Sequence, residues 1–515
     1  MTIPPLPTRL AIATALLISG AVAIEAQEPD FATDDPVIRA IWDQGMTDAS
    51  EVEWLAQRLL DSIGPRLLGS PANDAANAWV RSRYDAWGIA NRAHEYGTWR
   101  GWVRGYSHID LVAPRVRTLN GMMQAWSAPT DGPLEAEVVV FPSAISNAEE
   151  YRAWLDTVGG KIVMLSAPEP TCRAPESWEE RATPESWERM QALQRETARA
   201  NALARRASGS NDLPGDVEAA GAVAVVSANW SNGWGANKYF ASPVEAIPGI
   251  QLSCEDYGLV HRLATNDQGP RLRLDLASDD LGQRPVFNII AELPGTELPD
   301  EYVVLSAHLD SWDAGSGATD NGSGTVMMME AMRILKAVYP NPRRTILVGH
   351  WGGEERGLIG SNAFAEDHPE VVEGLQANFN QDNGTWRIDF VRMQGFTGAG
   401  SHFGRWFSAI PDAITSQIEL DIPGVPESGG SDHMAFICRL APGFRLQSNY
   451  PDYRQYTWHT EIDTFDKLVF DDLRNNATLA AMLAYLASED PVRMETHPRE
   501  DARYTPCRTA PRSGG

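Results

Sequence analysis

A strand–helix–strand pattern near the middle of the chain constrains the fold more than any other feature. Three near-continuous apolar runs, FNIIAEL (287–293), YVVLSAH (302–308) and TILVGHW (345–351), are typical of strands buried on both faces of a sheet. A helix rich in Met, Leu and Ala is expected over 324–338, between the last two runs. Strand, helix and strand over this length make a βαβ unit. We therefore predict an α/β fold with a mixed, mostly parallel central sheet flanked by helices.

The flanking segments have other patterns. Helical periodicity covers 36–91, interrupted by the turn-like GPRLLGSP at 64–71, and a closing helix is expected over 471–488. Between about 120 and 280 the pattern changes to short apolar runs between Gly and Pro turns, which predict strands at 136–141, 161–165, 222–226 and 247–252. A charged stretch at 174–207 interrupts these strands and is expected to form a surface helix or a pair of helices.

The first residues have the pattern of a secretory signal peptide. Arg9 precedes an apolar run over 10–24, and Ala23 and Ala26 are small residues that suit cleavage. The run is short for a bilayer span, so we expect cleavage and export, to the periplasm or outside the cell, rather than an uncleaved anchor. No later run is apolar for long enough to span a membrane.

The composition limits the partners. The 515 residues carry a net charge of −26, which repels nucleic acid and anionic lipid. We expect no nucleic-acid partner, and no membrane association once the signal is removed. Four cysteines without a CxxC motif fit an oxidising compartment and one or two disulfides, whose pairing the sequence leaves open. They are Cys172, Cys254, Cys438 and Cys507.

Candidate catalytic side chains follow the carboxyl ends of the predicted strands, where open α/β sheets build their sites. His308 and Asp310 alternate and so point the same way, which allows one to bind a metal ion while the other orients the imidazole. Asp320 lies in a Gly-rich loop before a helix, where its carboxylate can bridge two ions. Of the adjacent Glu354 and Glu355, one can bind metal while the other takes a proton from water.

Two more candidates complete a binuclear site. Asp382 ends the segment ANFNQD, and His459 lies in TWHTEIDT. With Asp320 shared, two imidazoles and three carboxylates give three protein ligands to each of two ions, and this mixed ligation fits catalytic zinc. Each residue alone has an ordinary explanation, such as a helix cap for Asp320 or a hydrogen-bonded structural histidine for His459. The expectation of two Zn²⁺ ions depends on the set His308, Asp320, Glu355, Asp382 and His459.

Six motifs together resemble metallopeptidase family 28, the zinc exopeptidases, over nearly the whole mature chain. They are GPRLLGS from Gly64, HLDSWDAGSGATDNGSG from His308, EERG from Glu354, QDNG from Gln381, SGGSDH from Ser428 and WHTEIDT from Trp458. The resemblance implies hydrolysis of short peptides or dipeptides by a metal-activated water. It also implies a homodimer.

The resemblance assigns roles residue by residue. One zinc would be held by His308, Asp320 and Asp382, and the other by Asp320, Glu355 and His459. Glu354 would be the general base and then the acid, and Asp310 would orient His308. Asp432 and His433 would line the substrate pocket.

Together with the signal-peptide pattern, the resemblance implies five segments. They are a signal peptide (1–26), the first part of the peptidase domain (27–119), an inserted β-rich protease-associated domain (120–284), the main part of the peptidase domain with the metal site (285–490) and a C-terminal tail (491–515).

Other functions remain to be weighed. A serine hydrolase or a zincin is disfavoured, because the chain contains neither GxSxG nor HExxH. Within the resemblance, the alternatives are a glutaminyl cyclase with one zinc and a catalytically inactive receptor or binding protein. The five ligand candidates and Glu354 favour the peptidase. Whether it acts as an aminopeptidase, a carboxypeptidase or a dipeptidase stays open.

Overall fold

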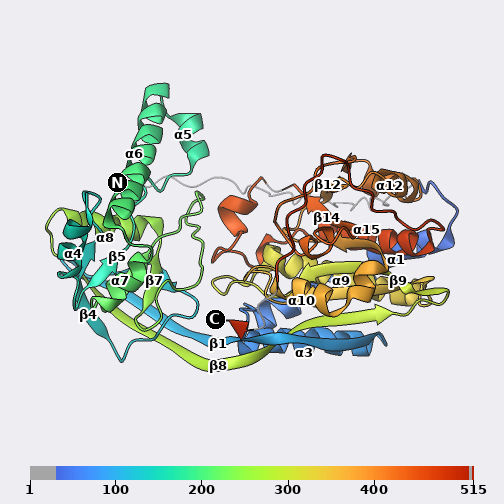
Figure 1. Ribbon diagram of the computed structural model, residues 1–515, viewed down its shortest axis with the longest axis horizontal. Helices are drawn as coiled ribbons and strands as arrows, with labels where there is room; N and C mark the ends of the chain where they lie inside the picture. The colour runs from blue at the N-terminus through green and yellow to red at the C-terminus, as the bar shows by residue number, and fades with distance from the viewer. Residues whose placement is uncertain (1–29, 450, 510–512, 515) are drawn as a thin grey trace, which may run out of the picture.

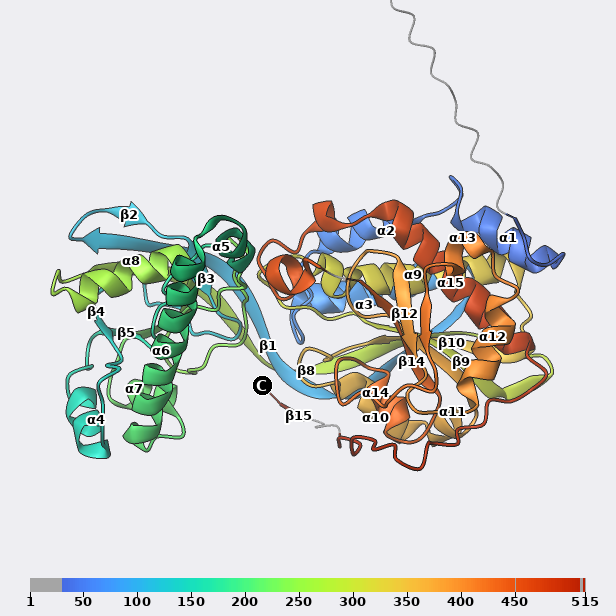
Figure 2. The same cartoon turned by 90° about the horizontal axis from the view of Figure 1, so that it is seen from above.

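Two lobes are joined by one long antiparallel ribbon in the computed structural model, which describes residues 30–449, 451–509 and 513–514 (Figure 1). The ribbon pairs β1 (Ala90–Ala113) with β8 (Arg271–Leu293) along nearly their full length. The view from above shows the lobes side by side, with these two strands running from one into the other (Figure 2). The expected signal peptide, 1–26, lies outside the described residues.

The larger lobe contains the predicted mixed sheet. Its strand order is β13-β12-β14-β11-β9-β10-β8. The central strands β9 (Leu298–His308), β10 (Arg344–Trp351), β11 (Leu375–Asn380) and β14 (Gly443–Ser448) are parallel to their neighbours within this group, whereas β8 joins β10 antiparallel. The expected βαβ unit and the mixed, mostly parallel sheet are confirmed.

Side chains on alternate positions of the central strands pack on opposite faces of this sheet. Val303 and Leu305 of β9 belong to a large core with α9 (Ser323–Val338) and α15 (Phe470–Glu489), while Val304 packs on the other face. That other face is covered by α10 (Ile359–Asp367), α11 (Pro369–Glu373) and α14 (Met434–Ile437). Strands buried on both faces explain the near-continuous apolar runs in the sequence.

The N-terminal segment is helical up to Ala86, a few residues short of the expected 91. Its elements are α1 (Pro36–Gly45), α2 (Val52–Gln57), η1 (Arg58–Ile63) and α3 (Pro71–Ala86). The turn expected at 64–71 separates η1 from α3. Helix α3 begins with Ser70, whose hydroxyl accepts a hydrogen bond from Asn73 N, and Pro71 at its first position, so the GSP sequence starts the helix.

The smaller lobe is built on strands in the order β4-β5-β6-β7-β3, and β4 joins this sheet to β8. The four strands expected from short apolar runs are β4 (Leu134–Val140), β5 (Ile162–Met164), β6 (Ala224–Ser227) and β7 (Gly249–Leu252). The helices are α4 (Ala148–Leu155), α5 (Pro175–Arg181), α6 (Pro184–Ser208), α7 (Leu213–Ala219) and α8 (Cys254–Thr265). Whether this lobe is a protease-associated domain stays a prediction.

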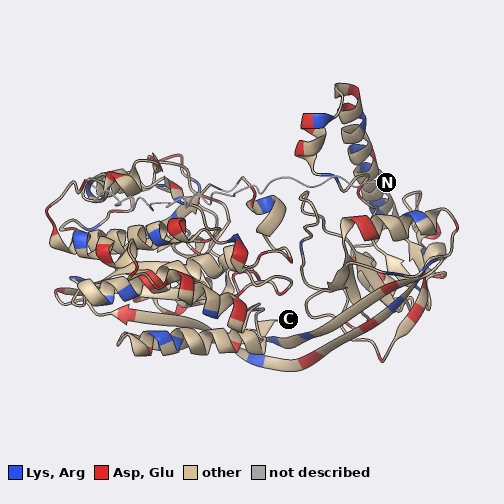
Figure 3. Ribbon diagram, turned by 180° about the vertical axis from the view of Figure 1, so that it is seen from behind, with Lys and Arg blue, Asp and Glu red and all other residues tan. Residues whose placement is uncertain are grey.

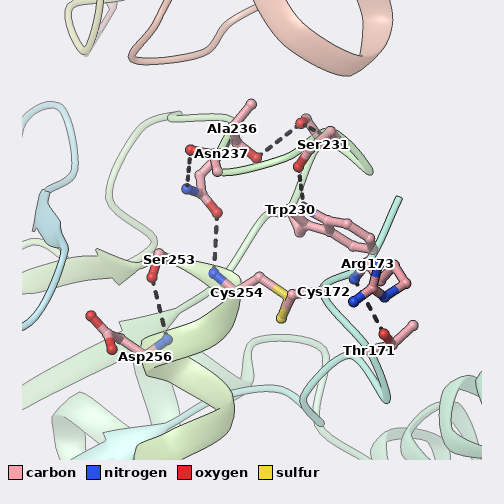
Figure 4. The surroundings of a disulfide bond; sticks show 12 residues. Thr171, Cys172, Arg173, Trp230, Ser231, Ala236, Asn237, Ser253, Cys254 and Asp256 are labelled. Carbon is pink, nitrogen blue, oxygen red and sulfur yellow. Dashed lines mark hydrogen bonds between the residues drawn. A yellow bond between two sulfur atoms is a disulfide. The ribbon is translucent and has the colours of Figure 1, made fainter. Parts of the chain in front are cut away.

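Helices α5 and α6 project from the smaller lobe (Figure 1) and confirm the expected pair of surface helices. Both helices carry Glu and Arg, so charges of both signs lie along them (Figure 3). Each begins with the repeated PESWE sequence, which puts Pro at the first helical position. A disulfide between Cys172, just before α5, and Cys254, at the start of α8, fastens this segment to the lobe (Figure 4).

The remaining described elements are short. They are β2 (Arg117–Thr118), β3 (Gly121–Met123), η2 (Ala318–Gly322), β12 (Ile388–Arg392), α12 (Ala399–Phe407), α13 (Asp412–Thr415), β13 (Glu419–Asp421), η3 (Tyr453–Thr457), η4 (Phe465–Lys467) and β15 (Ser513–Gly514). Among the helices in the described part of the chain, none combines the length and the apolar character needed to cross a bilayer.

Candidate active site

Five of the predicted site residues meet where β9, β10 and β11 end, in two groups that share Asp320. In the first group, His308 Nε2 lies 3.3 Å from Asp320 Oδ1 and 3.2 Å from Asp382 Oδ1. In the second, His459 Nε2 lies 3.2 Å from Asp320 Oδ2 and 2.9 Å from Glu355 Oε2. The two oxygens of one carboxylate therefore face two different imidazoles, and each group gathers three candidate ligands.

The donor set fits two cations. His308 Nδ1 lies 2.9 Å from the carbonyl oxygen of Asp310, which can only accept, so Nδ1 carries a proton that it donates. The opposite ring nitrogen then faces two carboxylate oxygens, an arrangement that needs a positive charge between them. Glu355 Oε1 is buried without a hydrogen-bond partner in the described structure. Buried oxygens of this kind suit metal ligands.

The sequence predicted that Asp310 orients His308, and in the structure Asp310 also contacts the backbone of two glutamates. Its carboxylate Oδ1 is 3.7 Å from His308 Nδ1, and its carbonyl is the nearer acceptor for the ring. The carboxylate accepts hydrogen bonds from the backbone N–H groups of Glu354 (3.1 Å) and Glu355 (3.3 Å). Asp310 thus links the loop after β9 to the loop after β10, and it fixes the backbone of both glutamates.

Burial and crowding of charge shape the electrostatics. Burial raises the pKa of Glu354 well above its ordinary value, and the nearby carboxylates Asp382 and Glu355 raise it further against the opposing effect of His308. Burial likewise raises the pKa of Glu355 to about 7. For His459, burial lowers the pKa, but Glu355 and Asp320 outweigh it and raise the value to about 9. The surplus of carboxylates around this imidazole therefore attracts positive charge, whether from a proton or from a metal ion.

Two residues clamp the loop that presents Asp320. Arg66, fully buried, donates from Nε to Leu309 O (2.6 Å), from Nη1 to Gly64 O (3.1 Å) and Ser316 O (2.7 Å), and from Nη2 to Gly317 O (2.9 Å). The carboxylate of Asp463 accepts from the N–H groups of Thr319 and of Asp320 itself, the latter at 3.1 Å. The only sequence signal for Arg66 is its place in the GPRLLGS motif, and Asp463 follows His459 by four residues.

Arg356 is held by three tryptophans. Its guanidinium lies 5.5 Å from the ring centre of Trp99, 5.1 Å from Trp126 and 5.7 Å from Trp312. Cation–π contacts with three rings fix the side chain that directly follows Glu355. The tryptophans lie far apart in the sequence, so no sequence pattern predicted this cage.

The smaller lobe packs on the loop that carries His459. Tyr239 N donates to His459 O (2.9 Å), and the ring of Phe240 lies edge-on to the imidazole at 5.3 Å. Gln455, in η3 of the same loop, donates to the Glu176 carboxylate of α5, the helix that faces the larger lobe in Figure 2. The backbone of His459 has φ 61, a strained value for a side chain of this kind. These contacts hold that conformation in place.

A cavity of about 310 Å³ opens over the two groups. Its walls include Glu354, the glycines Gly429 and Gly430, and three arginines. Asp432 and His433 are fully buried and are not among the lining residues. His433 Nε2 instead contacts Glu427 Oε2 at 2.6 Å. Direct contact of these two residues with a substrate stays a prediction.

Comparison with known proteins shows which proteins this chain resembles. Residues 288–484 match the model of peptidase family M28. Carboxypeptidase Q of Rattus norvegicus is 26% identical over 442 residues, which cover 84% of this chain and 84% of that protein. Carboxypeptidase Q of Homo sapiens is 24% identical over 435 residues, with the same coverage of both chains.

Two solved structures share the fold. A peptidase M28 precursor from Shewanella amazonensis superposes with a TM-score of 0.64 at 24% identity, covering 90% of this chain and 98% of that chain. A zinc aminopeptidase from Bacillus subtilis gives a TM-score of 0.54 at 19% identity, covering 88% and 98%. Residues 288–484 thus match peptidase family M28, and the chain as a whole is similar to carboxypeptidase Q and to a solved peptidase M28 precursor.

Proposed function

We propose that this chain is an exported zinc-dependent exopeptidase that hydrolyses short peptides. One observation carries the proposal: Asp320 turns its two oxygens toward two imidazoles, each of which is completed by one more carboxylate. His308, Asp320 and Asp382 would hold one Zn²⁺, and Asp320, Glu355 and His459 would hold the other. Three protein ligands to each ion would leave room for water and substrate. The likeness to a zinc aminopeptidase from Bacillus subtilis supports the choice of metal.

The chemistry follows from the positions of the side chains. Two zinc ions, when bound, would acidify a water molecule and polarise the scissile carbonyl. Glu354 lines the cavity beside the ligands, and burial keeps the pKa of its carboxylate high. It therefore takes the proton from the water and returns it to the nitrogen of the leaving amine. Asp310 holds Glu354 in place through the backbone N–H, so the base is positioned independently of the ions.

Two further features support the substrate class and the location. The cavity volume of about 310 Å³ lies at the low end of the range for small-molecule sites, roughly 300–1,000 Å³, and suits a short peptide. Two disulfides, Cys172–Cys254 and Cys438–Cys507, fit an oxidising compartment, in keeping with the proposed export. We also propose that the smaller lobe shapes one wall of the site through its contacts with the His459 loop.

The test separates metal binding from proton transfer. Glu354→Gln should keep about two zinc ions per chain and lose roughly 10²–10⁴-fold in kcat on a dipeptide, because the amide cannot take up the proton. Zinc is measured by atomic absorption and turnover by release of free amino acid. Glu373→Gln, an exposed glutamate in α11, is the matched control and should behave as wild type. A fully active Glu354→Gln enzyme, or wild-type protein that holds no zinc, would refute the proposal.

A further inference from the structure

Three arginines line the cavity above the candidate metal ligands, in a protein of net charge −26. They are Arg445, Arg454 and Arg508. The floor of the cavity is acidic, and its charge would be balanced by bound metal ions. The guanidinium groups on the walls therefore remain as positive charges that a substrate can meet.

The three arginines differ in their partners. Arg445 donates to the carbonyl of Asp382 at 3.0 Å and lies 4.0 Å from Glu427, so it is tied to the protein. Arg454 lies 4.1 Å over the ring of Trp458, beside His459. Arg508 is exposed and has no hydrogen bond or ion pair with the residues that the structure describes. It is the guanidinium that is free to pair with a ligand.

The tail that carries Arg508 is anchored in two places. The ring of Tyr504 stacks on Phe396 at 5.6 Å, and its hydroxyl donates to Gln394 O at 2.9 Å. Cys507, the residue before Arg508, forms a disulfide with Cys438, directly after α14. The tail is thereby held against the wall of the cavity. An arginine at this position is placed as part of the site, although it follows the candidate ligand Glu355 by 153 residues.

The position of Arg508 indicates which part of a substrate it meets. Its Nη1 lies 3.5 Å from the point that a Cβ on Gly357 would occupy, and Gly357 follows Glu354 by three residues in the same loop. In the proposed mechanism Glu354 returns a proton to the leaving amine, so the leaving residue lies on the Glu354 side of the cavity. A guanidinium on that side is placed for the group at the far end of the leaving residue.

We propose that Arg508 binds the free α-carboxylate of the leaving residue, and that the chain therefore cleaves dipeptides and short peptides at the bond next to a free C-terminus. This inference rests on the proposed peptidase function and specifies its substrate class. A guanidinium pairs with a carboxylate through two parallel N–H donors, and an uncharged amide at the same place gains less. The tail and its disulfide thus act as a specificity element.

The experiment compares three substrates on the zinc-loaded, full-length protein: L-Ala-L-Leu, L-Ala-L-Leu amide and L-Ala-L-Glu α-amide. Wild type should show kcat/KM about 10- to 100-fold higher for the free acid than for its amide, the effect expected of one charged hydrogen-bonded pair. Arg508→Met should bring this ratio to within about threefold of one, and Arg508→Lys should give an intermediate value. The paired Cys438→Ser, Cys507→Ser variant should also lower the ratio, because it releases the tail.

The controls fix the interpretation. Arg503→Met, which removes an exposed arginine of the same tail outside the cavity, should keep the wild-type ratio. The inference is overturned if wild type treats acid and amide alike, if Arg508→Met keeps the wild-type ratio, or if Arg454→Met alone abolishes it. Rapid Arg508-dependent cleavage of L-Ala-L-Glu α-amide would assign the contact to a side-chain carboxylate and would also overturn it. If the protein hydrolyses none of the three substrates, the peptidase function itself is refuted instead.

Discussion

Arg66 offers the sharpest test of how the fold supports the site. Its guanidinium is fully buried and makes four hydrogen bonds to backbone carbonyls, three of them in the segment that leads from β9 to Asp320. Replacing Arg66 by Met keeps much of the side-chain volume and removes all four donors. The loop would then lose the contacts that hold its carbonyls inward, while Asp463 still binds its N–H groups.

The magnitude can be worked from the structure. Four charged hydrogen bonds at roughly 2 kcal/mol each give about 8 kcal/mol of stabilisation. Burial lowers the pKa of Arg66 from its ordinary value to about 10, which corresponds to a cost of about 3 kcal/mol for keeping the charge inside. The difference predicts that Arg66→Met lowers the free energy of unfolding by about 5 kcal/mol, a large effect for one residue. Arg66→Lys should lose about half as much, since one ammonium cannot reach all four acceptors.

The assay is urea unfolding of zinc-loaded and zinc-stripped protein, followed by tryptophan fluorescence, together with a zinc titration. Arg66→Met should unfold at lower urea in both forms and bind zinc more weakly, because Asp320 is no longer held in place. Arg58→Met, an exposed arginine in η1, is the matched control and should change stability by less than about 0.5 kcal/mol. Arg66→Met protein with the stability and zinc content of this control would refute the clamp.

Three further predictions concern the ligands, the tryptophan cage and a buried histidine. Asp320→Asn should lower zinc content from about two ions per chain to below one, measured by atomic absorption, because an amide bridges two cations poorly. Arg356→Met should lower kcat/KM about tenfold with little change in zinc content, since the cage no longer fixes the glutamate loop. Burial lowers the pKa of His350 to about 3. Below about pH 6.5 the imidazole is therefore protonated in the unfolded chain but stays neutral in the folded chain. The folded state therefore loses up to roughly 5 kcal/mol of stability from this residue as the pH falls from about 6.5 toward 3. His350→Gln should make the free energy of unfolding depend less steeply on pH in this window.

Each of these three substitutions has a matched control at a residue of the same type. Asp300→Asn is exposed and should keep both ions, and Arg173→Met removes an arginine that lies over one exposed tryptophan only. His497→Gln, with 75% of its side chain exposed, should leave the pH slope as in wild type. Full zinc content in Asp320→Asn, wild-type kinetics in Arg356→Met, or an unchanged pH slope in His350→Gln would each contradict the corresponding reasoning.

Much of the larger lobe could be predicted because its signals are local. The apolar runs that became β9 and β10 and the helix between them follow from burial on both faces of a sheet, which leaves a mark in consecutive residues. The ribbon strand β1 gave no such signal. Much of it is exposed or only partly buried, it contains three glycines, and its register with β8 shifts at four places. Pairing with β8, whose partner residues lie 158 to 202 positions further along the chain, makes it a strand, and periodicity does not report such pairing.

The sequence by itself determined the candidate chemistry: which histidines and carboxylates end the strands, and that Glu354 stands beside Glu355. Only the tertiary structure decided that Arg66 and Asp463 clamp the Asp320 loop, how the cysteines pair, and that a tail arginine reaches the cavity. The physical reason is the range of the interactions. Residue type and spacing record what each segment needs locally, whereas contacts between distant segments form only when the whole chain has closed around one core.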